Sequence, residues 1–152
     1  MKKLGKLNTR QINHLLKNQA WGRLGCHCDG VTYVVPVNYV YDGGSIYCHS
    51  GEGMKVKMMR KNPEVCFEVE AIDNIVNWQS VIAWGRFEEL TDMCQKQEVM
   101  QKLIDSIMPL TTGNTAHPSH GITAAASDIG TKIDLVLYKI VLKEKTGRFE
   151  KR

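Results

Sequence analysis

Residues 35–70 read VPVNYVYDGGSIYCHSGEGMKVKMMRKNPEVCFEVE and pass through strand, turn, strand, helix and strand patterns in succession. The first two strand patterns meet at Asp42-Gly43-Gly44, where the glycines favour a tight turn. The helix pattern ends at Asn62, because Pro63 disfavours a helical conformation in the residue before it. Glu64–Ile72 then alternates apolar and polar side chains, as a strand with one buried face does.

Similar patterns flank this stretch on both sides. Asp29-Gly30 is a strong hairpin signal, and capping residues open one helix at Thr9 and another at Thr91-Asp92. The predicted elements are a helix at Thr9–Gln19, strands at Trp21–Asp29, Val31–Tyr41, Ser45–His49, Glu64–Ile72, Asn77–Leu90 and Ile133–Lys143, and a helix from Thr91 to about Met108. Six strands with short turns and helices outside them predict a mainly β, α+β fold, built as a small antiparallel barrel.

Length and composition narrow the class of protein. The chain has 152 residues, 43% of them hydrophobic, which predicts a single domain over residues 1–152 with its own core. A formal charge of +4, spread along the sequence, is too small to predict a nucleic-acid partner. Neither a signal peptide nor a membrane-spanning run is recognisable. The five cysteines follow no disulfide framework, so we expect a cytoplasmic protein with no membrane partner.

The segment Gly51–Val56 is the candidate anion site. Its spacing is not that of a nucleotide P-loop, which requires G-x-x-x-x-G-K-[ST]. Its glycines let the backbone approach a ligand closely, and a helix that begins here points N–H groups at an anion. Lys55 lies in the first turn and can bring its ammonium group to the same point. The alternative interpretation is a solvated helix start with ordinary surface lysines.

Histidines and cysteines are the candidates for metal binding and proton transfer. Cys26-His27-Cys28 places three soft ligands in a row, but strand alternation sends His27 to the face opposite the two cysteines, so no metal site is predicted. His117 and His120 lie in a long loop, which is either a functional lid or a loop without a role in function. No nucleophile can be placed beside a base. The catalytic residues therefore stay unknown, with His49, His117 and His120 as candidates for proton transfer.

Pro36 and two tryptophans suggest where a flat ligand would bind. Proline cannot donate to a strand ladder, so the strand that contains Pro36 is predicted to lie at an edge or to be bulged. Backbone groups left without a strand partner could then hydrogen-bond the edge of a heterocycle. Trp78 and Trp84 alternate with polar residues along a later strand, which is typical of core or dimer packing; stacking on a planar ligand is the alternative.

Taken in order, three fragments resemble the FMN-binding split-barrel proteins related to pyridoxamine 5′-phosphate oxidase, and most of all their nitroimidazole-resistance-type branch. The fragments are the stretch at 35–70, WQSVIAWGRFEEL at 78–90, and KTGR at 145–148. The resemblance runs from about Trp21 to Leu90, with a weaker echo at Gly147-Arg148. It implies a homodimer of six-stranded antiparallel split β-barrels with two FMN molecules at the subunit interface.

The same resemblance implies a set of cofactor-binding residues. The backbone of one strand would lie along the isoalloxazine ring, through Val35, Pro36, Val37 and Asn38. His49 and Ser50 at a strand end, together with Lys55 at the helix start, would hold the phosphate. Trp84 or a neighbour would close the site from the partner subunit.

The implied function is an FMN-dependent oxidoreductase that acts on a small organic substrate, as a nitroimidazole reductase does. The C-terminal KTGRFEKR lacks the arginine pattern with which pyridoxamine phosphate oxidases hold the phosphate of their substrate, so that activity is not expected.

Two alternatives use the same residues. One is a flavin-binding or flavin-sensing module without turnover, and the other is a haem-binding split barrel with His49 or His117 as the ligand.

Overall fold

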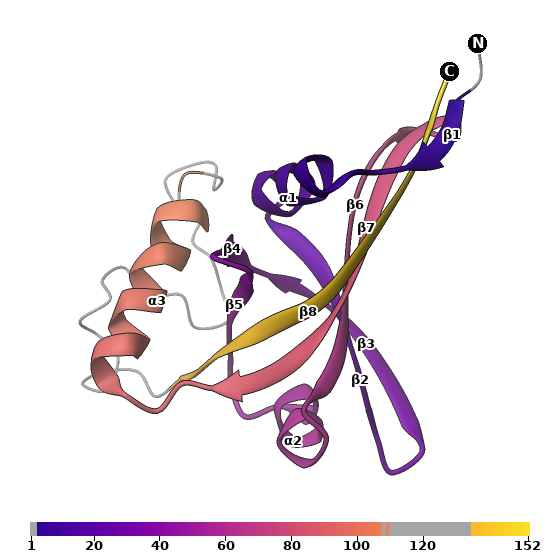
Figure 1. Cartoon of the computed structure of the whole chain (residues 1–152). Helices are drawn as coiled ribbons and strands as arrows, with labels where there is room; N and C mark the ends of the chain where they lie inside the picture. Colours follow the sequence, from indigo (N-terminus) through magenta and orange to yellow (C-terminus); the bar gives the residue numbers. More distant parts are fainter. Residues whose placement is uncertain (1–2, 108, 110–134) are drawn as a thin grey trace.

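The chain is built around one curved antiparallel sheet. The computed structural model describes residues 3–107, 109 and 135–152. Its elements, in chain order, are β1 (Lys3–Lys6), α1 (Thr9–Asn18), β2 (Trp21–Cys28), β3 (Val31–Asn38), β4 (Val40–Asp42), β5 (Ser45–Ser50), α2 (Met54–Lys61), β6 (Glu64–Asn74), β7 (Asn77–Glu89), α3 (Met93–Ile107) and β8 (Val136–Lys151). The predicted mainly β, α+β class, with helices outside the sheet, is confirmed (Figure 1).

The strands follow the order β3-β2-β6-β7-β8-β5-β4, and β1 adds to the C-terminal end of β8. The sheet curls into a barrel, with α1 and α2 at opposite ends of it and α3 to one side (Figure 1). Within the described residues the path does not close, because β3 and β4 are its two edges. The barrel is therefore split, as the resemblance implied.

The described sheet has eight strands instead of the six predicted. The short, polar β1 shows no alternating pattern in the sequence. The predicted strand Val31–Tyr41 is two strands, because the backbone leaves the ladder at Tyr39. The Tyr39 N–H donates to the carbonyl of Ala20 at 3.2 Å, and its hydroxyl donates to the carbonyl of Leu16 at 2.7 Å. These bonds turn the buried Tyr39 toward α1.

The last strand is longer than predicted. It was expected to end at Lys143, but β8 continues to Lys151. Its distal half, KEKTGRFEK, carries polar residues on both faces and so has no strand pattern. Ladders on both sides hold it extended, since Glu150 pairs with Leu4 of β1 and with Trp78 of β7. The predicted start of this strand, Ile133, lies outside the described residues.

Alternating side chains fill the inside of the barrel. Phe67 of β6 meets Tyr39 edge-on, with ring centroids 4.9 Å apart. The amphipathic helix α1, which begins at a capping box formed by Asn8 and Gln11, packs its apolar face on this core. A second apolar cluster lies under α3 and includes Val99, Met100, Leu103, Ile107, Leu135 and Leu137. Among the described helices, none is long and apolar enough to cross a membrane.

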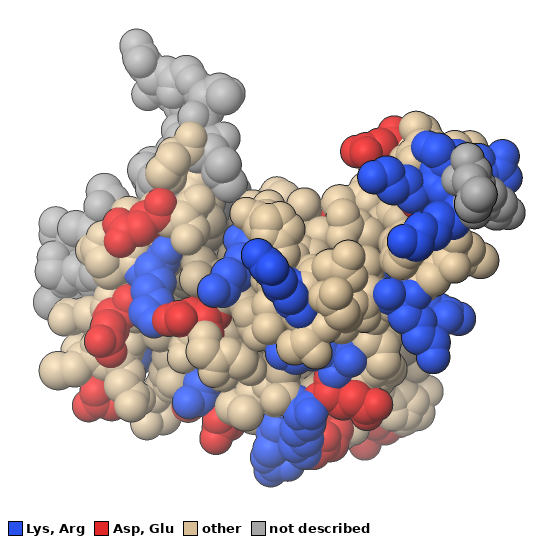
Figure 2. All heavy atoms as spheres, turned by 45° about the horizontal axis from the view of Figure 1, so that its top comes forward, with Lys and Arg blue, Asp and Glu red and all other residues tan. Residues whose placement is uncertain are grey.

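Basic side chains gather at one end of the molecule. Figure 2 shows lysines and arginines grouped around the end that carries the two termini. Lys3 lies opposite Lys151, and Lys6 lies opposite Arg148, so like charges face each other across the β1–β8 ladder. This end is far from α2, where the candidate anion site lies (Figure 1).

Candidate functional site

The connection from β5 to α2 forms the candidate anion site. His49 and Ser50 end β5, and both are buried. The Ser50 hydroxyl donates to the carbonyl of Gly51 at 2.7 Å. Gly53 donates its N–H to the same carbonyl at 2.9 Å and serves as the N-cap of α2. The strand end, the loop and the helix start therefore lie where the sequence predicted them.

The first turn of α2 has no side-chain cap. In α1 the Asn8 side chain accepts the N–H of Gln11 at 2.9 Å, and at the start of α3 Asp92 accepts the N–H of Gln95 at 3.0 Å. Gly53, the N-cap of α2, has no side chain that could do this. The first N–H groups of a helix have no partner within it and carry partial positive charge. An anion in the loop would supply what the protein does not.

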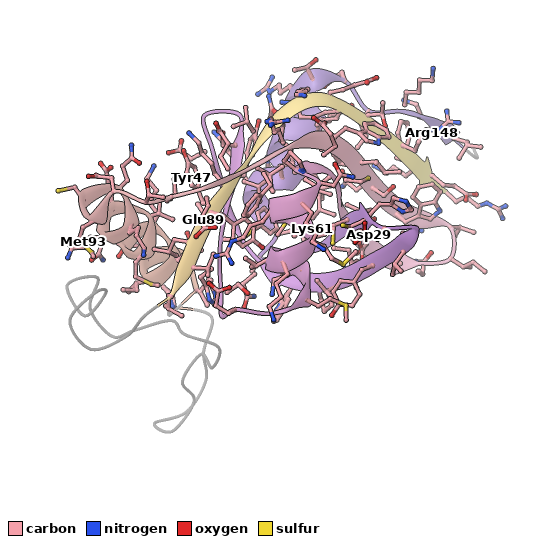
Figure 3. The ribbon with its side chains drawn as sticks, turned by 90° about the horizontal axis from the view of Figure 1, so that it is seen from below. Asp29, Tyr47, Lys61, Glu89, Met93 and Arg148 are labelled. Carbon is pink, nitrogen blue, oxygen red and sulfur yellow. The ribbon has the colours of Figure 1, made fainter. Side chains whose placement is uncertain are left out.

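Lys55 lies in this first turn and is half-buried. Burial lowers the pKa of its ammonium group, and the thiols of Cys48 on β5 and Cys26 on β2 counter that effect only in part. In the described part of the chain, no carboxylate lies within ion-pair distance of Lys55, whereas Lys61 pairs with Asp29 at 3.4 Å (Figure 3). A half-buried cation without a counter-ion is costly, and a bound anion would remove that cost.

The two loop glycines leave open space at this point. A Cβ atom added to Gly51 or to Gly53 would meet no atom of the described residues within 4 Å, its own chain neighbours aside. Neither glycine has a positive φ, so the backbone conformation does not require glycine. The space above the loop is therefore available to a ligand that approaches the backbone, and a phosphate group fits the donors that surround it.

Arg60 fixes the loop to the sheet. This residue of α2 donates to Glu52 at 2.6 and 2.9 Å and to Glu89 at the end of β7 at 2.7 and 3.0 Å. The hydrogen bond from Arg60 holds the pKa of Glu52 below its ordinary value. The one acid in the glycine loop is thus neutralised by Arg60 and held away from Lys55. This contact could not be predicted from local sequence patterns, because Glu89 belongs to a distant strand.

The predicted ring-binding strand is β3. It is an edge strand, as Pro36 predicted, and Pro36 lies opposite Arg23 with its ring exposed. Val35 and Val37 pack toward the core, and the half-buried Asn38 donates its side-chain amide to the carbonyl of Ala20 at 3.4 Å. The edge of β3 that has no strand partner among the described residues is where the predicted backbone contacts would form, and those contacts stay a prediction.

Trp84 is not part of this site within one protomer. It lies on the outer face of β7 opposite Glu144 of β8, whereas His49 lies opposite Leu137. Leu137 and Glu144 are seven residues apart on one strand, which corresponds to ~23 Å. The same small ligand could reach both residues only if Trp84 came from a second copy, which stays a prediction.

Two predictions remain, one about the loop histidines and one about the Cys26-His27-Cys28 motif. His117 and His120 lie outside the described residues. In Cys26-His27-Cys28 the buried Cys26 faces Met58 and the exposed His27 faces Thr32, so the predicted alternation is confirmed. Within residues 3–107, 109 and 135–152, no three His, Cys, Asp or Glu side chains cluster as metal ligands would.

A sequence model of the family described as pyridoxamine 5′-phosphate oxidase matches residues 8–148. The chain belongs to this family. The match covers the β5–α2 connection and all of the described strands except β1 and the end of β8. The pyridoxamine 5′-phosphate oxidase family is thus the one to which the resemblance pointed.

Two solved structures and one curated protein are similar to this chain. An FAD-binding protein of Mesorhizobium loti is 24% identical with a TM-score of 0.78, over 100% of both chains. A candidate 5-nitroimidazole antibiotic resistance protein of Bacteroides thetaiotaomicron is 22% identical with a TM-score of 0.67, over 99% of this chain and 89% of that one. An uncharacterized protein of Rhizobium meliloti (strain 1021) is 35% identical over 79 residues, about half of each protein. The two structures share the fold of this chain.

Proposed function

We propose that this chain binds FMN as a homodimer and uses it as an oxidoreductase on a small organic substrate. The observation that carries the proposal is Lys55, a half-buried cation with no carboxylate partner in the described residues, beside a helix start whose N-cap is a glycine without a capping side chain. The phosphate of FMN is a dianion that would pair with both. The family match and the FAD-binding neighbour of the same fold support a flavin.

The rest of the site fits the other parts of FMN. The backbone edge of β3 can donate and accept hydrogen bonds along the rim of a flat ring. The space at Gly51 and Gly53 lets the phosphate approach the backbone. The site as described holds one cationic side chain for one phosphate group, which favours FMN over the longer FAD. Trp84 lies far from His49 along the sheet, so in this proposal it would contact the flavin only from the second copy.

The protein's part in the chemistry is to bind and orient. A bound flavin would supply the transfer of a hydride or an electron pair. Lys55 and α2 hold the phosphate, Arg60 keeps the Glu52 carboxylate away from it, and β3 orients the ring. A proton donor among His49, His117 and His120 is a prediction that stays open. A flavin-binding module without turnover would use the same residues.

The test is a visible absorbance spectrum of the freshly purified protein, before and after FMN is added and the sample desalted. We expect a flavin spectrum that survives desalting, and chromatography of the released cofactor should identify FMN. Bleaching by NADH or NADPH, and recovery on addition of an organic acceptor, would distinguish an enzyme from a module. A colourless protein that retains no flavin contradicts the proposal, as would a Soret band, which indicates haem. Release of FAD alone would contradict FMN.

Arg60→Met should weaken the binding of FMN about fivefold, the scale of one uncompensated charge a few ångströms away in water. Without Arg60, the carboxylate of Glu52 is released close to the phosphate site. Fluorescence titration with FMN measures the change. The control is Lys102→Met, which removes an equally exposed ion-pair cation on α3; the two cations are 38% and 37% exposed. Equal affinities in the two variants would show that Arg60 has no role in the site.

A further inference from the structure

An apolar patch lies on the outer face of the sheet. Val34 of β3 and Ile82 and Trp84 of β7 are 61%, 37% and 41% exposed. Val34 and Trp84 line a groove of about 450 Å³ that also includes Gly25 and Cys66. The strand register connects these four residues in one row, from Val34 through Gly25 and Cys66 to Trp84. A contiguous apolar patch of this kind typically marks an interaction surface.

An acidic pair lies beside the groove on the same face. Arg23 of β2 donates to Oε1 of Glu70 at 2.8 Å. The other oxygen of Glu70, Oε2, is buried and accepts no hydrogen bond from the described residues. A proton on Glu68 would satisfy this oxygen. Burial, followed by the hydrogen bond and the charge of Glu70, raises the pKa of Glu68 to about 7, while Arg23 lowers it.

The other strands bring few charges to this pair. On β2 the facing charge is Arg23, which lies opposite Glu68, and the titratable His27 lines the same groove. On β7 the facing residues are the uncharged Ile82 and Ser80. The next acid along β6, Glu64, is held by Arg86 at 3.2 Å and Lys143 at 3.4 Å. When Glu68 and Glu70 share a proton, they and Arg23 sum to zero charge. Without the proton, one negative charge is left over.

We propose that a second copy of this chain docks on the outer face of β2, β6 and β7, and that a proton shared by Glu68 and Glu70 is required for tight association. The inference rests on the homodimer of the proposed function. It adds which face of the sheet forms the dimer and how protonation controls the association. A face that carries both an arginine and a carboxyl pair is complementary to itself, because a two-fold axis brings Arg23 of one copy toward the acids of the other.

The shared proton matters because association removes this face from water. A neutral carboxyl pair loses little when it is desolvated, whereas an uncompensated carboxylate in an interface is costly. Glu68 must therefore take up a proton to enter the dimer wherever it is ionised in the free chain. Linkage then requires the dimer to weaken as the pH rises above neutrality.

Sedimentation velocity over a dilution series of the full chain, at about pH 6 and about pH 8.5, measures this effect. We expect a dimer at the lower pH and a dissociation constant at least about tenfold larger at the higher pH. Glu68→Gln keeps a neutral hydrogen-bond donor beside Glu70, so its dissociation constant should not change with pH. The control Glu98→Gln, an exposed acid on α3, should keep the pH dependence of the unaltered chain.

A second pair of variants tests the face itself. Trp84→Lys should weaken the dimer at least tenfold at both pH values, the scale of a lost interface anchor at about 1.4 kcal/mol or more. Met93→Lys introduces the same charge at an equally exposed apolar residue on α3, 42% exposed against 41% for Trp84, and should leave the dimer intact. Circular dichroism checks that both variants fold.

Several results would overturn the inference. They are a monomer at about pH 6, a dimer that Trp84→Lys does not weaken, or a pH dependence that survives in Glu68→Gln. Flavin absorbance, recorded on the same samples, separates this inference from the proposed function. A dimer without flavin would contradict flavin binding and leave the docking face standing. A monomer that retains flavin would contradict the docking face and leave flavin binding standing.

Discussion

Gly85→Ala is expected to lower the free energy of unfolding by at least about 2 kcal/mol and the melting temperature by roughly 5–10 °C. Gly85 lies on β7, where the register with β8 shifts between Trp84 and Gly85. A methyl group there would overlap the carbonyl oxygen of Val141 and come within 2.9 Å of Cγ2 of Ile140. A backbone carbonyl within a ladder cannot rotate away as a side chain can, so the β7–β8 pairing itself must shift.

Gly25→Ala is the matched control for this substitution. Gly25 is also a strand glycine, but a Cβ atom there would lie 3.6–3.8 Å from its neighbours, which is an ordinary contact. We expect its unfolding free energy to change by less than about 0.5 kcal/mol. Urea unfolding at equal protein concentration compares the two variants. A loss of the same size in both would show that the cost belongs to alanine in a strand and not to the crowding at Gly85.

Gly85 also illustrates how far the sequence alone could go in predicting the fold. The pattern around it, VIAWGRFEE, is clearly that of a strand, and an isolated glycine in a strand indicates a bulge or a close approach. Which strand approaches depends on the pairing of β7 with β8, and that pairing is non-local. The same limit explains the end of β8, where ladders from β1 and β7 hold a charged segment that has no strand pattern of its own.

The candidate site was predictable where its residues are adjacent in the sequence. Gly51, Gly53 and Lys55 could be recognised because a helix start needs only local patterns, and Pro36 indicated an edge strand for the same reason. The contact of Arg60 with Glu89 and the acidic pair beside Arg23 could not be found, because they join residues of different elements. Short-range patterns therefore identify the candidate anion site, and the tertiary structure supplies the residues that hold its loop in place.

Lys55→Met is expected to weaken FMN binding about 5- to 150-fold, which is the effect of losing a charge-assisted contact of roughly 1–3 kcal/mol. The substitution keeps an apolar side chain of similar length and removes the ammonium group. In the absence of FMN the variant should be at least as stable as the unaltered chain, because it no longer half-buries a cation that has no carboxylate partner among the described residues. Fluorescence titration and thermal unfolding without ligand measure the two effects.

Lys57→Met is the control, because Lys57 lies on the same helix but points about 200° away from Lys55 and is exposed. It should leave the affinity for FMN nearly unchanged. The pH dependence provides a further check. Burial lowers the pKa of Lys55, so the unaltered chain should lose affinity for FMN at alkaline pH, where the ammonium group loses its proton. Lys55→Met should lack that loss. If both lysine variants bind FMN as tightly as the unaltered chain, the phosphate does not lie at the start of α2.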